Sequence, residues 1–171
     1  MLALVFLIWY LGEVGILVIL APEPLLSRYQ TAEEREKIKK EAGEYNARAL
    51  TLAGLTFAAI SLIYGTAQNP LVVADTLTVL VASLSFFLLS YSLTALVHHR
   101  KVYWVVQDKS LAFGYVSMFA GVAVLMYERF PTAFVAAAVG LGMVLVLHFM
   151  EFASDFRRWG QEEGVMGVPK A

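Results

Sequence analysis

The chain of 171 residues has no cysteine, and its 13 basic residues are balanced by 14 acidic residues. The lack of cysteine excludes a disulfide framework and a cysteine-ligated zinc or iron–sulfur site. The lack of a basic excess argues against a nucleic-acid partner. The sequence also contains no Walker A loop, no G-x-S-x-G nucleophile motif and no H-E-x-x-H zinc motif. We therefore expect neither an enzyme nor a bound cofactor.

Apolar residues, in contrast, make up 59% of the chain and gather in long runs. The segments 2–21, 49–67, 76–97, 111–127 and 131–150 contain a single charged residue between them, Glu13. A membrane core of about 30 Å needs about 20 apolar residues in a helix, with a lower limit of about 17. The runs do not alternate as barrel strands do. The sequence predicts an all-α, multi-pass membrane protein, a single domain over 1–171 built as a bundle of five transmembrane helices.

The boundaries of these helices follow from where the charges return. We expect membrane helices over about 2–21, 46–67, 71–97, 111–127 and 131–153, followed by a tail over 154–171. Thr31 and Glu34 form a capping box, which predicts a charged helix over about 32–48 that runs into the second membrane helix. This extension is either a solvated anchor beside the membrane or a docking element for a cytoplasmic protein partner.

The basic residues predict the orientation of the chain in the cell membrane. Twelve of the 13 Lys and Arg residues fall in the segments 22–48 and 98–110 and in the tail, whereas the opposite side has only Arg129. Loops close to the membrane on the cytoplasmic side are enriched in Lys and Arg. We therefore expect an outside amino terminus, a cytoplasmic carboxyl terminus and a plasma-membrane location.

Glu13 is the most informative residue, because it lies in the middle of an apolar helix. Placing an ionisable side chain there costs about 2.5–3.5 kcal/mol, so it should face protein or water and not lipid. Gly12 and Gly15 flank it and leave room for another backbone or for water. Two interpretations stay open: a carboxylate that carries a cation or proton, and a protonated acid that joins two helices by a hydrogen bond.

A second polar group lies at the inner end of the fifth membrane helix. His148, Glu151 and Asp155 follow spacings of three and four, which place them on one helix face. Counting from the inner ends puts His148 within roughly 5 Å of the depth of Glu13. The two side chains can meet if the first and fifth helices are neighbours.

Other polar residues suggest further parts of a pathway. The same depth count places Thr56, Ser90 and Ser117 in one layer, although hydroxyl side chains in membrane helices often bond their own backbone carbonyls. Asp75, at the outer end of the third helix, either attracts cations or stabilises the first turn of its helix.

A metal or haem site is the least favoured reading of the histidines. The weak candidate ligands are His98, His99, His148 and Asp155. A di-iron bundle needs two Glu-x-x-His pairs and two further Glu residues, and this chain has one His-x-x-Glu pair without that set.

Three functions follow from these residues. The leading hypothesis is a small homo-oligomeric channel or transporter for cations or protons in the lipid bilayer. Its pathway would contain Glu13, with His148, Glu151 and Asp75 along it. The alternative is a non-catalytic membrane subunit or scaffold that binds a partner through 32–48 and the tail. A membrane redox protein with haem or metal ranks third.

Overall fold

The computed structural model describes residues 2–20, 31–66, 73–97, 99–129 and 131–166, together with the side chains of most of them. Five helices account for nearly all of these residues, and no strand occurs among them. They are α1 (Leu2–Leu20), α3 (Ala32–Thr66), α4 (Ala74–Leu93), α5 (Lys101–Arg129) and α6 (Pro131–Met166). Each contains a stretch long and apolar enough to cross a membrane. The predicted all-α architecture with five apolar helices is confirmed.

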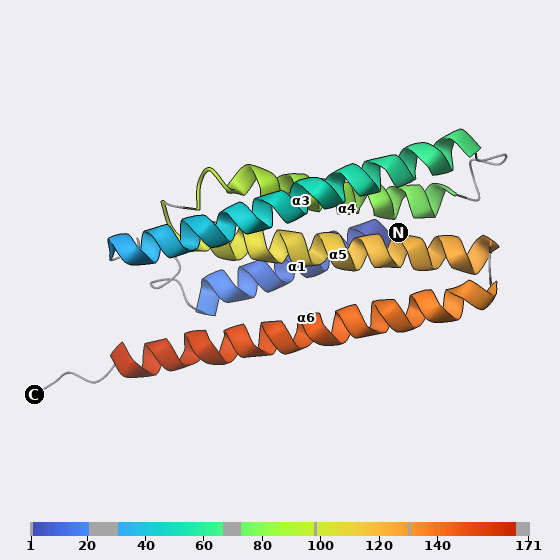
Figure 1. Cartoon of the computed structure of the whole chain (residues 1–171). Coiled ribbons are helices and arrows are strands. Elements are labelled where there is room, and N and C mark those ends of the chain that lie inside the picture. Colours follow the sequence, from blue (N-terminus) through green and yellow to red (C-terminus); the bar gives the residue numbers. More distant parts are fainter. Residues whose placement is uncertain (1, 21–30, 67–72, 98, 130, 167–171) are drawn as a thin grey trace, which may run out of the picture.

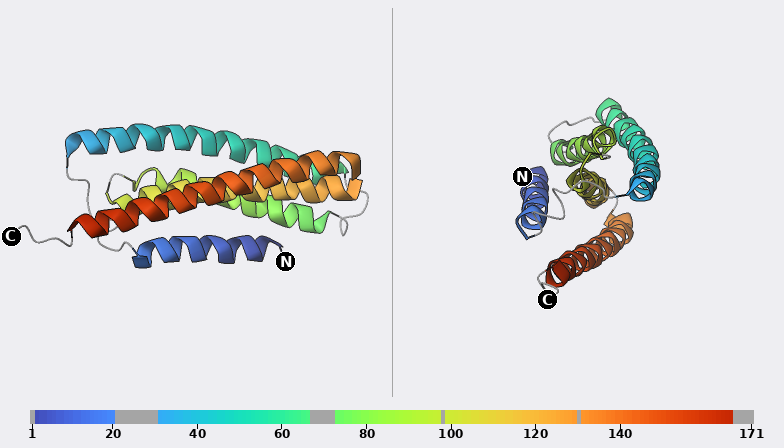
Figure 2. Two further views of the ribbon diagram at one scale, coloured as in Figure 1. Left: turned by 90° about the horizontal axis from the view of Figure 1, so that it is seen from below. Right: turned by 90° about the vertical axis from the view of Figure 1, so that its left-hand side faces the viewer.

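The helices form an elongated bundle around α5 (Figure 1). In the end-on view of Figure 2, α1, α3 and α4 lie around one side of α5, and α6 stands on the other side. Helix α5 packs on all four of the others, whereas α6 packs on α5. We call the end of the bundle where α3 and α5 begin and α1, α4 and α6 end the charged end.

Helices α3 and α6, with 35 and 36 residues, are much longer than a bilayer needs. At 1.5 Å per residue, the 19 residues of α1 span about 28 Å, close to the membrane core, whereas the 35 residues of α3 span about 52 Å. The surplus of α3 is the predicted charged helix, which joins the membrane helix without a break. Its start is capped as predicted, because the Glu34 backbone N–H donates to Thr31 Oγ1 at 3.1 Å.

Three predicted boundaries at the charged end are wrong. The segment 98–110 is not a loop, because α5 begins at Lys101, ten residues before the predicted 111. Helix α4 ends at Leu93, and the residues after it form turns up to Val97. Helix α6 extends to Met166, so most of the expected tail over 154–171 is helical. The charged residues before 111 do not keep α5 from starting at Lys101, because 101–113 contain neither Gly nor Pro.

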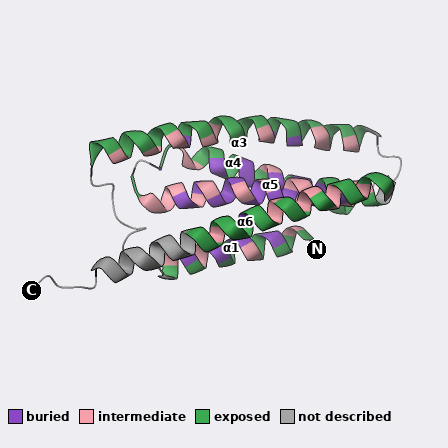
Figure 3. Ribbon diagram, turned by 60° about the horizontal axis from the view of Figure 1, so that its bottom comes forward, coloured by how far each residue is buried: buried purple, intermediate pink, exposed green. Residues whose placement is uncertain are grey.

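The core lies where α4, α5 and α3 meet. Phe87 of α4 is fully buried and clusters with Ala49 and Ala53 of α3 and Leu111 of α5. Figure 3 shows the buried residues gathered on α5 and on the faces turned toward it, with the outer faces of α3 and α6 exposed. Much of the exposed surface on α6 is apolar, which suits contact with acyl chains.

At Gly114 of α5, the backbone packs closely against the Phe87 ring of α4. A Cβ atom added at Gly114 would overlap the Phe87 ring, whereas one added at Gly142 of α6 would meet nothing within 4 Å. We expect Gly114→Ala to lower the free energy of unfolding by about 1–3 kcal/mol, because a buried ring must shift. Gly142→Ala is the matched control and should be neutral or stabilising by up to about 1 kcal/mol. Thermal unfolding of both variants in detergent checks this, and equal effects would contradict the packing.

Candidate functional site

Glu13 and His148 meet where α1, α5 and α6 come together, a place that we call the seam. Glu13 Oε1 lies 3.0 Å from His148 Nε2, which is a hydrogen bond between α1 and α6. Both side chains are almost completely inaccessible, with exposed fractions of 5% and 2%. The sequence predicts this contact only if the first and fifth membrane helices are neighbours. In the structure these helices, α1 and α6, are joined by this hydrogen bond. The intramembrane acid therefore faces protein.

Aromatic rings surround the imidazole of His148. Trp9 of α1 and Phe113 of α5 approach it edge-on, with ring centroids at 5.5 and 5.0 Å. Phe149 of α6 stacks on Trp9 with a centroid distance of 5.5 Å. These rings pack around the Glu13–His148 pair and supply much of its apolar surroundings.

One atom of each partner has no hydrogen bond within the described part of the chain. These atoms are Glu13 Oε2 and His148 Nδ1, both buried. A pocket of about 230 Å³ between α5 and α6 is lined by His148 and, one turn nearer the charged end, by Glu151. Glu151 itself is exposed. Aromatic rings therefore pack against His148, and a pocket with an acidic residue at its rim lies beside it.

A third ionisable residue, Lys109, lies at the same level of the seam. Along the antiparallel helices α1 and α5, Trp9 contacts Phe113 at a centroid distance of 5.1 Å, and Leu17 clusters with Val105. Glu13 is midway between the two α1 residues, and Lys109 is midway between the two α5 residues. Residues four apart share a helix face, so this register sets Lys109 opposite Glu13.

The burial of Lys109 agrees with that position, since its exposed fraction is 0%. No ion pair joins the two side chains in the described structure, but a buried positive charge at the level of a buried carboxylate lowers the electrostatic cost of that carboxylate. Sequence analysis placed Lys109 in a cytoplasmic loop and missed it. The signal that could have found it is the unbroken helix-forming stretch from Lys101 into the apolar run.

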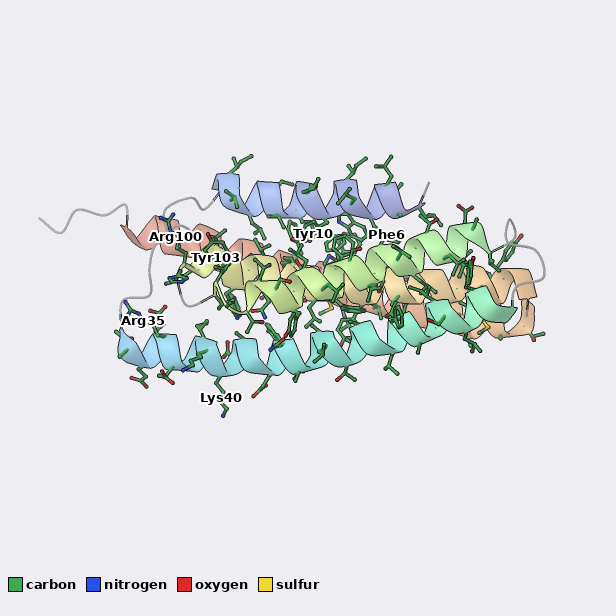
Figure 4. The ribbon with its side chains drawn as sticks, turned by 90° about the horizontal axis from the view of Figure 1, so that it is seen from above. Phe6, Tyr10, Arg35, Lys40, Arg100 and Tyr103 are labelled. Atoms are coloured by element: carbon green, nitrogen blue, oxygen red, sulfur yellow. The ribbon has the colours of Figure 1, made fainter. Side chains whose placement is uncertain are left out.

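Helix α1 is held on α5 and α4 by two aromatic residues on its inner face. Tyr10 is hydrogen-bonded to Ser110 at 2.9 Å, and its ring contacts Phe86 and Phe113 at 5.0 and 5.4 Å. Figure 4 shows Phe6 and Tyr10 pointing from α1 into the bundle. These contacts fix the rotation of α1 and so direct Glu13, one turn further along, into the seam.

The flanking glycines do not serve as close-approach sites within the described chain. A Cβ atom added at Gly12 or Gly15 would meet nothing within 4 Å. The expected approach of another backbone is therefore not made at these two positions.

Two members of the predicted polar layer, Ser90 and Ser117, differ in depth. Thr56, Ser90 and Ser117 are buried, and their hydroxyl oxygens have no hydrogen-bond partner in the described structure. Ser117 lies one turn from Gly121, which faces Leu80 of α4, whereas Ser90 is ten residues further along α4. Since Ser117 is itself four residues from Gly121 toward the charged end, Ser90 and Ser117 differ in depth by about six residues, or about 9 Å. The depth count assumed equal helix ends, but the helices begin and end at different levels.

The remaining candidates lie apart from the seam. Asp75 is exposed in the first turn of α4, where a carboxylate favours the helix dipole, and is eleven residues, about 16 Å, from Phe86. His99 is exposed at the charged end. His98 lies outside the described residues, and so does the side chain of Asp155. Among the residues that the structure describes, no group of three or more His, Asp or Glu could hold a metal ion.

No family model, curated protein or solved structure matches the chain. The functional interpretation therefore starts from the seam itself.

Proposed function

We propose that this protein is an integral membrane protein that transfers protons through the Glu13–His148 pair. The observation that carries the proposal is the 3.0 Å hydrogen bond between two buried ionisable side chains from different helices. Ionisable residues inside membrane helices commonly mark proton relays and ion pathways. Histidine suits this role because it exchanges protons near neutral pH.

The proposed relay uses both nitrogens of the imidazole. A proton from the side of the pocket binds His148 Nδ1, and the proton on Nε2 then passes to Glu13 Oε1 across their hydrogen bond. The ring is left in the other neutral tautomer. Release of the proton from Glu13 toward the end of the bundle opposite the charged end restores the carboxylate, and rotation of the imidazole then presents an N–H to Glu13 for the next transfer. Lys109, opposite Glu13, supplies a positive charge that stabilises the carboxylate between transfers. Glu151 at the pocket rim would gather protons from the charged end.

The seam favours a proton over a metal cation as the transported species. A cation that binds Glu13 would have to share the site with the buried Lys109, and like charges repel strongly where the dielectric constant is low. A proton needs no coordination shell and moves along hydrogen bonds. Of the two transported species that the sequence predicts, a cation or a proton, we therefore propose the proton.

We also propose that the charged end faces the cytoplasm of the cell membrane. The described basic residues at that end include Arg35, Arg48, Arg100 and Lys101, and an excess of Lys and Arg is typical of cytoplasmic loops. Figure 1 supports this grouping, since the starts of α3 and α5 lie at the same end of the bundle.

Proton flux into liposomes tests the proposed function. The purified chain is reconstituted with a pH-sensitive dye inside, and a potassium gradient with valinomycin supplies the driving potential. We expect acidification or alkalinisation well above the leak of protein-free liposomes. Flux no greater than that leak under either sign of the potential would refute the proposal.

A scaffold function is the second candidate, because the charged part of α3 is exposed. Its ion pairs, Lys37–Glu41 and Arg48–Glu44, are long at 3.9 Å and solvent-accessible, so they leave this surface available to a protein. A partner that co-purifies with the full chain and is lost on deletion of 31–44, without proton flux, would favour this function. A homo-oligomer belongs to the transport proposal and is tested by mass measurement in detergent.

A further inference from the structure

A second pocket lies at the charged end, far from the seam. It has a volume of about 450 Å³ and is lined by Arg35, Glu36, Lys39 and Ala42 of α3 and by Thr94 and Val97, which follow α4. We call it the basic groove. It takes no part in the proposed proton relay.

The floor of the basic groove is apolar and fixed in place. Ala42 and Val97 are almost fully buried, with exposed fractions of 2% and 1%. Beneath them, Gln107 of α5 donates from Nε2 to Thr94 Oγ1 at 2.9 Å and reaches the Ala42 carbonyl oxygen at 3.5 Å. One side chain thus links the two walls, so the floor is preformed.

The rim of the basic groove is positively charged. Arg35 and Lys39 are four residues apart and therefore share one face of α3. Glu36 offsets one of these charges, and Glu34 is paired with Lys101 at 3.1 Å across the gap between α3 and α5. Arg100 follows Val97 by three residues and is exposed. Figure 4 shows Arg35 and Arg100 at the same end, with Lys40 pointing away from the bundle.

The depth of the groove matches the headgroup layer of a bilayer. The predicted membrane part of α3 begins near Asn46, and Ala42 lies four residues beyond it, about 6 Å along the helix. Headgroups occupy roughly 5–7 Å outside each face of the hydrocarbon core. Tyr45 and Tyr103 are partly buried near this level, where aromatic rings prefer to lie.

We infer that the basic groove binds the headgroup of an anionic phospholipid. The phosphate would lie at the rim between Arg35 and Lys39, whose positive charges attract it. The glycerol and the first methylene groups would cover Ala42 and Val97. A cationic rim beside an apolar interior fits an amphiphile, whose phosphate and methylene groups match the two parts of the groove. Basic pockets between membrane helices are typical sites for acidic lipids.

Binding of defined lipids to the full chain tests this inference. The protein in a neutral detergent is titrated with phosphatidylglycerol or phosphatidylcholine, and bound lipid is counted by native mass spectrometry. We expect selective binding of phosphatidylglycerol, weakened about tenfold or more in the Arg35→Gln/Lys39→Gln variant, because two charges near the phosphate are lost. Both residues are exposed, and circular dichroism confirms the fold of the variant.

Lys37→Gln/Lys40→Gln is the matched control, since it removes the same charge from exposed positions of α3 that do not line the groove. We expect a change in its phosphatidylglycerol affinity of less than about twofold. Equal loss in the two variants would overturn the inference in favour of diffuse attraction to a basic helix. Equal binding of the two lipids would also overturn it, and so would competition by inorganic phosphate at the same concentration. Proton flux is not involved, so these outcomes are independent of the proposed function.

Discussion

Replacement of Lys109 by methionine should lower the free energy of unfolding by about 3–5 kcal/mol. Lys109 is fully buried and lies opposite Glu13 in the register of α1 and α5. Methionine keeps the length and apolar stem of lysine but removes the charge. The Glu13 carboxylate then stays buried with its His148 hydrogen bond but without a positive charge at the same level of α5. Unfolding of the purified variant by increasing SDS in mixed micelles measures the change.

A double-mutant cycle distinguishes pairing from simple loss of packing. If Lys109 acts through Glu13, then Glu13→Gln/Lys109→Met should be more stable than the sum of the single effects predicts, by about 0.5–3 kcal/mol. Lys40→Met makes the same chemical change on the exposed face of α3 and should shift stability by no more than about 0.5 kcal/mol. Additive effects in the cycle, or a loss in Lys109→Met no larger than that in Lys40→Met, would contradict the position assigned to Lys109.

Glu13→Gln should reduce proton flux by about a hundredfold or more, to the leak of protein-free liposomes. Glutamine has the size of glutamate and keeps an oxygen that accepts a hydrogen bond from His148 Nε2, so the seam keeps its contacts. It cannot accept and release a proton near neutral pH, and the relay stops at its second member. Flux at a fixed potential, normalised to the amount of reconstituted protein, gives the ratio.

Glu33→Gln is the control for this substitution. Glu33 is exposed in the first turn of α3 and is far from the seam, so the same chemical change there should leave flux unaltered. Monodisperse elution of both variants in detergent shows that assembly is intact. If Glu13→Gln conducts as well as Glu33→Gln, the carboxylate is not in the pathway and its hydrogen bond to His148 has a structural role.

The sequence was sufficient for the number of long apolar helices, because long uncharged apolar runs show directly in the sequence. It also predicted the cap at Thr31 and the unbroken charged extension of α3, since both depend on residues close together in the chain. The placing of Glu13 away from lipid followed from the cost of a charge in hydrocarbon. Each of these depends on local chemistry alone.

The rest depends on which helices are neighbours and in what register. Glu13 and His148 are 135 residues apart, and their contact requires α5 to bring α1 and α6 together through Phe113. In the sequence, Lys109 looks like a basic residue of a loop. Only the register of α1 against α5 places it at the level of Glu13. Ser90 and Ser117 of the predicted polar layer differ in depth for the same reason, because depth was counted from helix ends that do not align.

Proton transfer through the seam requires the Glu13 carboxyl to change its protonation state. Infrared difference spectroscopy measures this change most directly. Spectra of the reconstituted protein are recorded before and after a pH step across the neutral range. We expect the wild-type protein to show the carbonyl band of a protonated carboxylic acid at the lower pH. The band should be absent from Glu13→Gln and retained in Glu33→Gln. A wild-type spectrum without that band would show a permanently ionised Glu13 in a structural ion pair, and would contradict proton transfer through the seam.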